Sequence, residues 1–141
     1  MVVLDTDHLS LLLLAESEAA EKIAMRLASR HIRELTTTIV TYEEQTRGWL
    51  AQIARARNLP QEIEAYRRLK TSLQDFCTME VLDFDDEAAA EYRRLRGMKI
   101  RIGTMDLKIA AIALTHGATL LSRNLVDFKK VPVLEVEDWT A

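Results

Sequence analysis

A chain of 141 residues, 48% of them apolar and 29% charged, is long enough for one domain with a sizeable hydrophobic core. This composition excludes a disordered chain, and the net charge of −3 argues against a protein that coats nucleic acid by bulk charge alone. The single cysteine, Cys77, excludes an internal disulfide framework and argues against a cysteine-based metal site. The sequence has neither a basic leader nor an apolar run of about 18 residues, so a soluble, cytoplasmic protein with no membrane partner is expected.

The first part of the chain alternates apolar strand patterns with helical ones. Residues 2–4 form an apolar run typical of a strand buried on both faces, and a helix is expected over residues 8–14. Ser17 is a suitable N-cap for a second helix over residues 17–30. β-branched side chains then predict a strand over residues 35–40.

A long helical pair separates this second strand from the third. Thr41 is predicted to begin a helix that runs to about residue 57. Pro60 suits the first turn of the next helix, in which apolar residues recur at helical spacing up to Phe76. Because this pair is longer than a simple crossover, it is expected to stand off the domain as a small clip.

The remaining sequence returns to single helices between strands. A third strand over residues 79–82 precedes a helix that Asp85 is expected to cap and Gly97 to end. The helix over residues 104–116 is apolar nearly all round, which predicts burial. Two further strands are expected over residues 118–122 and 133–136.

This alternation predicts an α/β fold with a mainly parallel sheet of about five strands flanked by helices. In such a sheet, function lies at the carboxyl ends of the strands. Acidic or amide side chains follow three of the predicted strands, namely Asp5, Asp7, Glu44, Asn124 and Asp127. Asp106 follows a loop instead, and its position depends on the apolar helix that carries it.

Each acid also has a purely structural interpretation. Thr41 and Glu44 have the spacing of a capping box, Asp106 suits the positive end of a helix dipole, and Asp5 and Asp7 could cap the first helix. As a group the acids favour a metal site, because two carboxylates about 4 Å apart repel by about 4 kcal/mol at an effective dielectric of about 20. Oxygen ligands suit Mg²⁺ or Mn²⁺. The three histidines show no ligand spacing and are assigned no role.

Four segments of the chain resemble those of PIN-domain ribonucleases, with the greatest similarity to the VapC-type toxins of type II toxin–antitoxin pairs. The segments are LDTDHLS, TTIVTYEEQTRG, IGTMDLKIAAIALTHGATLLSRNLVDF and VPVLEVEDW, and the third is the most specific. The resemblance covers nearly the whole chain and implies one PIN domain over residues 1–141. It also implies Mg²⁺- or Mn²⁺-dependent endonucleolytic cleavage of RNA, a homodimer and an inhibitory, VapB-like antitoxin.

The resemblance assigns roles to individual acids by position. Asp5, Glu44 and Asp106 match the acids that hold the metal in the family, and Glu43 is a weaker candidate beside Glu44. The mechanism expected from this match is in-line hydrolysis of the RNA phosphodiester by a metal-activated water.

The fourth site position remains open between two residues. Some relatives place an acid where this chain has Asn124, and others use the acid three residues on, here Asp127. This chain also has Asp7 where many relatives have asparagine, which adds one negative charge to the expected site. The number of bound metal ions is open for the same reasons.

Basic residues are expected around such an acidic site, because RNA is repelled by carboxylates. Lys99, Arg101 and Arg123 lie close in sequence to the candidate acids and are expected to contact phosphates. The alternative for the neighbouring Arg93 and Arg94 is a solvated helix face.

Two other functions are compatible with parts of this pattern. A phosphohydrolase of the haloacid-dehalogenase type would use Asp5 as its nucleophile and Asp7 as the acid/base partner, but the SRNLVDF segment fits that chemistry poorly. An inactive PIN-like binding module is the second alternative, which Asn124 permits and the retained acids argue against.

Overall fold

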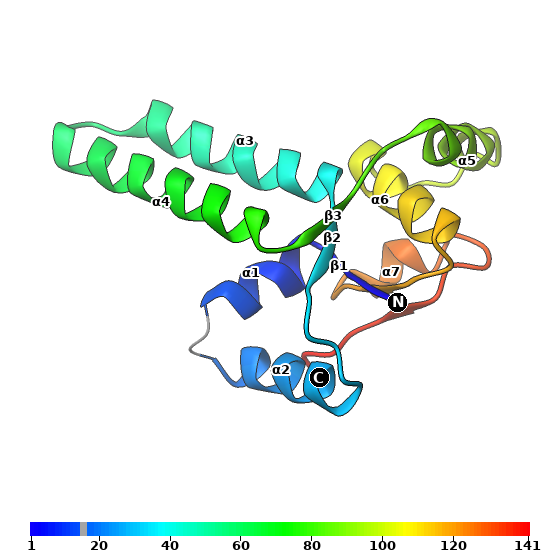
Figure 1. Ribbon diagram of the computed structural model, residues 1–141. Helices are drawn as coiled ribbons and strands as arrows, with labels where there is room; N and C mark the ends of the chain where they lie inside the picture. The colour runs from blue at the N-terminus through cyan, green and yellow to red at the C-terminus, as the bar shows by residue number, and fades with distance from the viewer. Residues whose placement is uncertain (15–16) are drawn as a thin grey trace.

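Short parallel strands form the centre of the computed structural model, which describes residues 1–14 and 17–141 (Figure 1). They are β1 (Val2–Leu4), β2 (Thr36–Thr38), β3 (Glu80–Leu82), β4 (Thr119–Leu121) and β5 (Val136–Glu137). Strand β4 pairs with both β1 and β5, while β2 pairs with β3. The hydroxyl of Thr37 donates a 2.8 Å hydrogen bond to the carbonyl of Leu4, which links β2 to β1. The predicted parallel α/β fold is therefore confirmed.

Helices connect these strands and cover the sheet. They are α1 (Thr6–Leu14), α2 (Glu18–Ser29), α3 (Ile39–Arg55), α4 (Leu59–Cys77), α5 (Asp86–Gly97), α6 (Thr104–Thr115) and α7 (Leu125–Phe128). Ser17 and Asp85 accept hydrogen bonds from backbone N–H groups at the starts of α2 and α5, as predicted. No helix in the described part of the chain combines the length and the hydropathy of a transmembrane span.

Each face of the sheet has its own hydrophobic core, because successive strand side chains point to opposite sides. Val3 and Leu120 are fully buried on the face covered by α5 and α6. Leu4 and Leu121 are fully buried on the other face, where α1 and α2 pack with Trp139 near the end of the chain. Burial on both sides fixes the register of the strands and the positions of their carboxyl ends.

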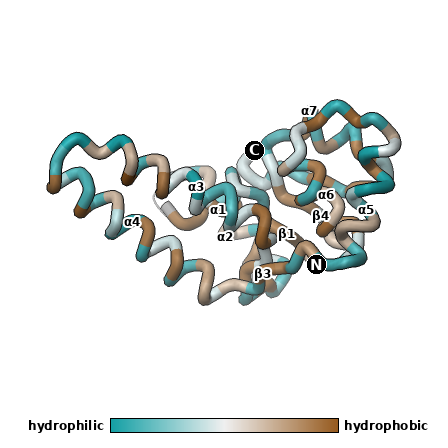
Figure 2. The backbone as a smooth tube through the Cα atoms, turned by 90° about the horizontal axis from the view of Figure 1, so that it is seen from above, coloured by the Kyte–Doolittle hydropathy of each residue, from teal (hydrophilic) through white to brown (hydrophobic). Residues whose placement is uncertain are grey.

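Helices α3 and α4 form a hairpin that projects from the sheet, and we call this hairpin the arm (Figure 1). Seen from above, the arm extends well beyond the rest of the molecule and carries apolar segments along its length (Figure 2). Its exposed large apolar side chains are Ile39, Leu50, Leu59, Ile63, Tyr66 and Leu73. The predicted clip is therefore confirmed.

Two helix ends differ from the sequence prediction. Helix α3 begins at Ile39, not at Thr41, because Thr38 has an extended backbone and accepts a 3.0 Å hydrogen bond from the Thr41 N–H. The alternative interpretation of Thr41 and Glu44 as a capping box is therefore wrong. At the end of α5, Gly97 remains helical, and Lys99 adopts the left-handed conformation (φ 55°) that was expected of a glycine.

The fifth strand also lies later in the chain than the predicted span of residues 133–136. Val133 has a φ of 70° and is 89% exposed, which excludes it from a buried strand. Pairing begins where the Glu135 carbonyl accepts a 2.8 Å hydrogen bond from the Leu120 N–H. Pro132 has no N–H to donate to a sheet, and the chain turns away there before β5 begins.

Candidate active site

The candidate acids gather at one edge of the sheet, where the carboxyl ends of β1, β2 and β4 meet. Asp5 directly follows β1, and its backbone N–H donates to the Leu121 carbonyl at the end of β4 at 2.9 Å. Glu44 comes from the second turn of α3, which follows β2, and Asp106 from the first turn of α6. The structure therefore brings together side chains that lie up to about a hundred residues apart in the sequence.

Asp5 is the most buried of these acids, with 6% of its surface exposed. Its Oδ1 accepts a hydrogen bond from the Thr6 N–H and its Oδ2 accepts one from the Ser122 hydroxyl, both at 2.8 Å. Burial, together with the smaller effect of the charges of Asp7 and Asp106, raises the pKa of Asp5 to about 6 despite these bonds. The negative charge of Asp5 is therefore poorly compensated.

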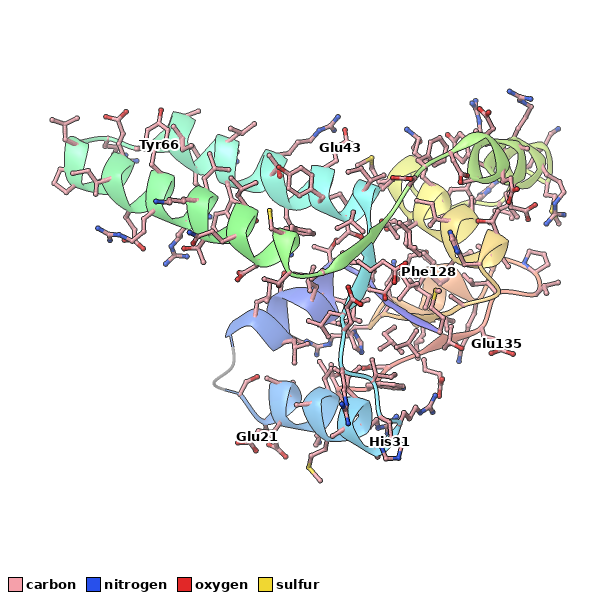
Figure 3. The ribbon with its side chains drawn as sticks, in the orientation of Figure 1. Glu21, His31, Glu43, Tyr66, Phe128 and Glu135 are labelled. Atoms are coloured by element: carbon pink, nitrogen blue, oxygen red, sulfur yellow. The ribbon has the colours of Figure 1, made fainter. Side chains whose placement is uncertain are left out.

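Thr6 links Glu44 to Asp5. The hydroxyl of Thr6, whose N–H binds Asp5, donates a 3.1 Å hydrogen bond to Glu44 Oε2. Burial raises the pKa of Glu44, as do the charges of Asp106 and Glu43. Glu43 itself lies on the side of α3 that faces away from α1 and pairs with Arg47 at 2.6 Å (Figure 3). Of the two adjacent glutamates, Glu44 is the one that faces the other acids.

Asn124 lies between Asp106 and Asp127. Its amide nitrogen donates to Asp127 Oδ2 at 3.0 Å and is 3.5 Å from Asp106 Oδ2. Burial raises the pKa of Asp106, and so does the charge of Asp127. The hydrogen bonds from Asn124 and Lys130 lower the pKa of Asp127. Both candidates for the fourth position, Asn124 and Asp127, therefore lie beside Asp106 and interact with each other.

Asp7 is joined to the site by residues that the sequence analysis did not select. Ser122 Oγ lies 3.2 Å from Asp7 Oδ2 as well as 2.8 Å from Asp5, and His8 Nδ1 lies 2.7 Å from Asp7 Oδ1. Burial alone would raise the pKa of Asp7, but hydrogen bonds from His8, the Arg123 N–H and Ser122 outweigh it and lower that pKa. The only available signal was the position of Ser122 at the carboxyl end of the strand predicted over residues 118–122.

The three predicted phosphate-binding residues, Lys99, Arg101 and Arg123, are all exposed. The backbone of Arg123 lies in the site, because its N–H donates to Asp7 at 3.0 Å. Arg101 is linked to the site through Lys130, whose ammonium group binds both the Arg101 carbonyl (3.0 Å) and Asp127 (3.2 Å). Lys99 lies in the loop between α5 and α6. The role of Lys130 was also missed, although its spacing from Asp127 suits a helical ion pair.

The charge of the three central acids is not balanced by protein cations. Among the residues that the structure describes, no lysine or arginine forms an ion pair with Asp5, Glu44 or Asp106. In residues 1–14 and 17–141, no three His, Cys, Asp or Glu side chains are already close enough to hold a metal ion. Carboxylates repel at short distance, and an all-oxygen group without a counter-charge fits a hard divalent cation. The role of Asp5, Glu44 and Asp106 as metal ligands stays a prediction.

Comparison with known proteins relates the chain to one family. A model of the PIN domain matches residues 2–134. Ribonuclease VapC1 of Rickettsia felis is 45% identical over 60 residues, which cover 40% of this chain and 45% of that protein. The tRNA(fMet)-specific endonuclease VapC of Salmonella typhimurium is 35% identical over 65 residues, which cover 43% and 49%. The chain thus spans about half the length of the curated relatives it matches.

The similarity to solved structures extends over the whole chain. The structure of VapBC-1 from nontypeable Haemophilus influenzae superimposes with a TM-score of 0.72 at 25% identity. The match covers 100% of both chains. The arrangement of strands and helices, including the arm, therefore belongs to a known fold.

Proposed function

The chain belongs to the PIN-domain family, and from that premise we propose that it is a metal-dependent endoribonuclease, the toxin of a VapBC-type toxin–antitoxin pair. The observation that carries this proposal is the buried, uncompensated carboxylate of Asp5 beside Glu44 and Asp106. The names of the relatives support RNA as the substrate, since VapC1 of Rickettsia felis is a ribonuclease. Family membership also removes the haloacid-dehalogenase alternative.

PIN-domain nucleases in general depend on divalent metal ions. We assign Asp5, Glu44 and Asp106 as the ligands, directly or through water, and Mg²⁺ or Mn²⁺ as the ion. When bound, the ion would lower the pKa of the attacking water and neutralise charge that develops on the phosphodiester. No covalent enzyme intermediate is required.

The surrounding residues hold these ligands in place. Thr6 fixes two of them at once, because its N–H binds Asp5 and its hydroxyl binds Glu44. Asn124 separates Asp106 from Asp127 and limits their repulsion. We assign the orientation of the attacking water to Asn124 and Asp127, which lie at the more exposed end of the acidic group. In-line attack then releases the leaving oxygen on the opposite side of the phosphorus.

Exposed basic residues would hold the RNA against this acidic site. Lys99, Arg101 and Arg123 are free of ion pairs within the part of the chain that the structure describes, so their charges are available to phosphates. Hydrogen bonds of their backbone atoms connect Arg101 and Arg123 to the site. Their assignment as phosphate-binding residues therefore has stronger support than that of Lys99.

We propose that the arm binds the antitoxin. A groove of about 350 Å³ lies between α1, α3 and α4, and the Trp49 Nε1 and Ser72 Oγ atoms on its lining have no hydrogen-bond partner among the described residues. Both atoms are already shielded from solvent, so the assignment rests on the exposed apolar side chains of the arm, such as Leu50, Leu59 and Ile63, which a bound polypeptide would remove from water. A homodimer and a cytoplasmic location stay predictions. The reading frame immediately upstream is expected to encode a small DNA-binding protein with a flexible tail.

The adjacent glutamates provide a matched test of the nuclease proposal. RNA cleavage should require Mg²⁺ or Mn²⁺, stop when a chelator is added, and fall more than about 100-fold in Glu44→Gln, since even residues that only orient ligands cost 10- to 100-fold. Glu43→Gln makes the same chemical change on the face that points away from the site and should cleave normally. Equal losses in the two variants, or cleavage in a chelator, would contradict the assignment. An intact protein with no Mg²⁺ or Mn²⁺ affinity would instead be an inactive binding module.

A further inference from the structure

His8 is fully buried between the acidic site and the carboxyl-terminal segment. One ring nitrogen, Nε2, lies 2.9 Å from the backbone nitrogen of Trp139, and the other, Nδ1, lies 2.7 Å from Asp7 Oδ1. His8 and Trp139 are 131 positions apart in the sequence. The imidazole therefore bridges two segments that only the folded chain brings together.

These contacts determine which ring nitrogen carries the proton. A backbone N–H can only donate, so Nε2 has to accept and cannot itself be protonated. The neutral ring then carries its proton on Nδ1 and donates it to Asp7. A doubly protonated ring would place two N–H groups against each other at Trp139. The fold therefore selects one tautomer, and that tautomer is the one that binds Asp7.

Asp7 connects His8 to the other residues of the acidic site. Its Oδ1 accepts from His8, and its Oδ2 lies within hydrogen-bond distance of both the Arg123 N–H and the Ser122 hydroxyl. Ser122 is also the donor to Asp5. His8 on one side and the adjacent residues Ser122 and Arg123 on the other thus hold Asp7 in one position, and Ser122 contacts both aspartates.

We propose that His8 is a positioning residue for cleavage, which carries the constraint from Trp139 through Asp7 and Ser122 to Asp5. The expected effect of His8 on the rate of cleavage rests on the proposed nuclease function. The expected effect on the position of Asp7 rests on the hydrogen bonds alone. An apolar side chain of similar volume would fill the same space but leave both the Trp139 N–H and Asp7 without their partner. Packing alone therefore does not account for an imidazole here.

Two substitutions separate the two hydrogen bonds. His8→Asn places an amide N–H near the position of Nδ1, so it keeps the donor to Asp7 and loses the acceptor for Trp139. His8→Gln places an amide oxygen near the position of Nε2, so it keeps the acceptor and loses the donor. We expect His8→Gln to lower kcat about 10- to 100-fold with little change in KM, the range for residues that orient ligands. We expect His8→Asn to keep kcat within a few-fold and to lower Tm more than His8→Gln.

A larger loss of kcat in His8→Asn than in His8→Gln would overturn the proposal. So would losses of kcat in the two variants that merely follow their losses of Tm. A double-mutant cycle gives a second criterion, since residues that act through one another are not additive. In an Asp7→Ala background, His8→Gln should have no further effect on kcat. Full additivity would show that His8 does not act through Asp7.

Two readouts do not depend on cleavage. ¹⁵N NMR of the imidazole should show a protonated Nδ1 and a bare Nε2, and the Nδ1 proton should exchange faster with solvent in Asp7→Ala; a proton on Nε2 would overturn the proposal. Mn²⁺ affinity should fall at least about 10-fold in His8→Gln but not in His8→Asn, and equal affinities would count against it. A wild-type chain that binds Mn²⁺ but cleaves no RNA would contradict the proposed function and leave these two tests of His8 intact.

Discussion

Replacement of Asp5 by asparagine should stabilise the fold while it abolishes cleavage. The amide oxygen of the introduced side chain can still accept from the Thr6 N–H, and its NH₂ group can donate to Ser122 Oγ. Ser122 is then free to donate to Asp7. Asp5→Asn therefore removes a buried negative charge without leaving these neighbours unpaired, and it removes a proposed metal ligand at the same time.

The expected gain follows from the pKa of Asp5. Burial, together with Asp7 and Asp106, raises it from the ordinary value of 3.8 to about 6. A difference of about two pH units corresponds to about 3 kcal/mol of destabilisation when Asp5 is ionised in the folded state. Below pH 3.8 the carboxyl is protonated whether folded or unfolded, and the penalty is absent; it grows between pH 3.8 and about 6 and is constant above. Because the new amide bonds will not fit perfectly, we expect about 2 kcal/mol at pH 7, or roughly 5 °C in Tm.

Thermal unfolding of both proteins in a chelator at pH 7 and pH 4 measures this effect. Asp5→Asn should have the higher Tm at pH 7, and most of the difference should disappear at pH 4. Adding Mn²⁺ should raise the Tm of the wild type and have much less effect on the variant. A variant that is less stable at pH 7, or equally stabilised at both pH values, would refute the view that Asp5 is an uncompensated buried charge.

Three further predictions concern the residues around Asp5. Thr6→Val keeps the shape of the side chain but removes the hydroxyl from Glu44, so we expect about 10-fold slower cleavage with less than about 1.5 kcal/mol lost in urea unfolding; an unchanged rate would show that Glu44 needs no such support. Ser122→Ala removes a donor that lowers the pKa of Asp5, so the acidic limb of the pH–rate profile should move to higher pH, and a profile that stays in place would contradict this. Arg101→Ala should weaken RNA binding and reduce the slope of log affinity against log salt by about one, whereas an unchanged slope would remove Arg101 from the phosphate-binding surface.

Local sequence patterns were sufficient to predict much of the fold. Neighbouring residues were enough to predict the buried strand β1, the buried helix α6 and the caps Ser17 and Asp85. Helix caps and buried apolar runs depend on short-range chemistry, which the local sequence shows directly. The position of Asp5 after β1 followed from the same patterns. The family resemblance then indicated which of the other acids belong to the same site as Asp5.

The errors and omissions concern contacts between distant parts of the chain. Both Thr38 and Thr41 are suitable N-caps, and the choice was settled by the pairing of β2 with β3, which keeps Thr38 extended. The bond between His8 and Trp139 spans 131 positions and has no local signature. The absence of strand pairing at Val133 depends likewise on where β4 begins, because in the observed register Val133 falls opposite Gly117, before the start of β4. Such details require the packed structure, since tertiary contacts override local preference.

Mn²⁺ titration of the wild type and Asp106→Asn tests most directly whether the acids form one metal site. Asp106 is the informative residue, because it lies in the first turn of α6, which follows a loop and not a strand, and only convergence of the fold brings it to Asp5. Isothermal titration calorimetry should show Mn²⁺ binding to the wild type, at least about 10-fold weaker binding to Asp106→Asn, and unchanged binding to Asp86→Asn, a control in the first turn of α5. Equal affinities in the wild type and Asp106→Asn would contradict the account.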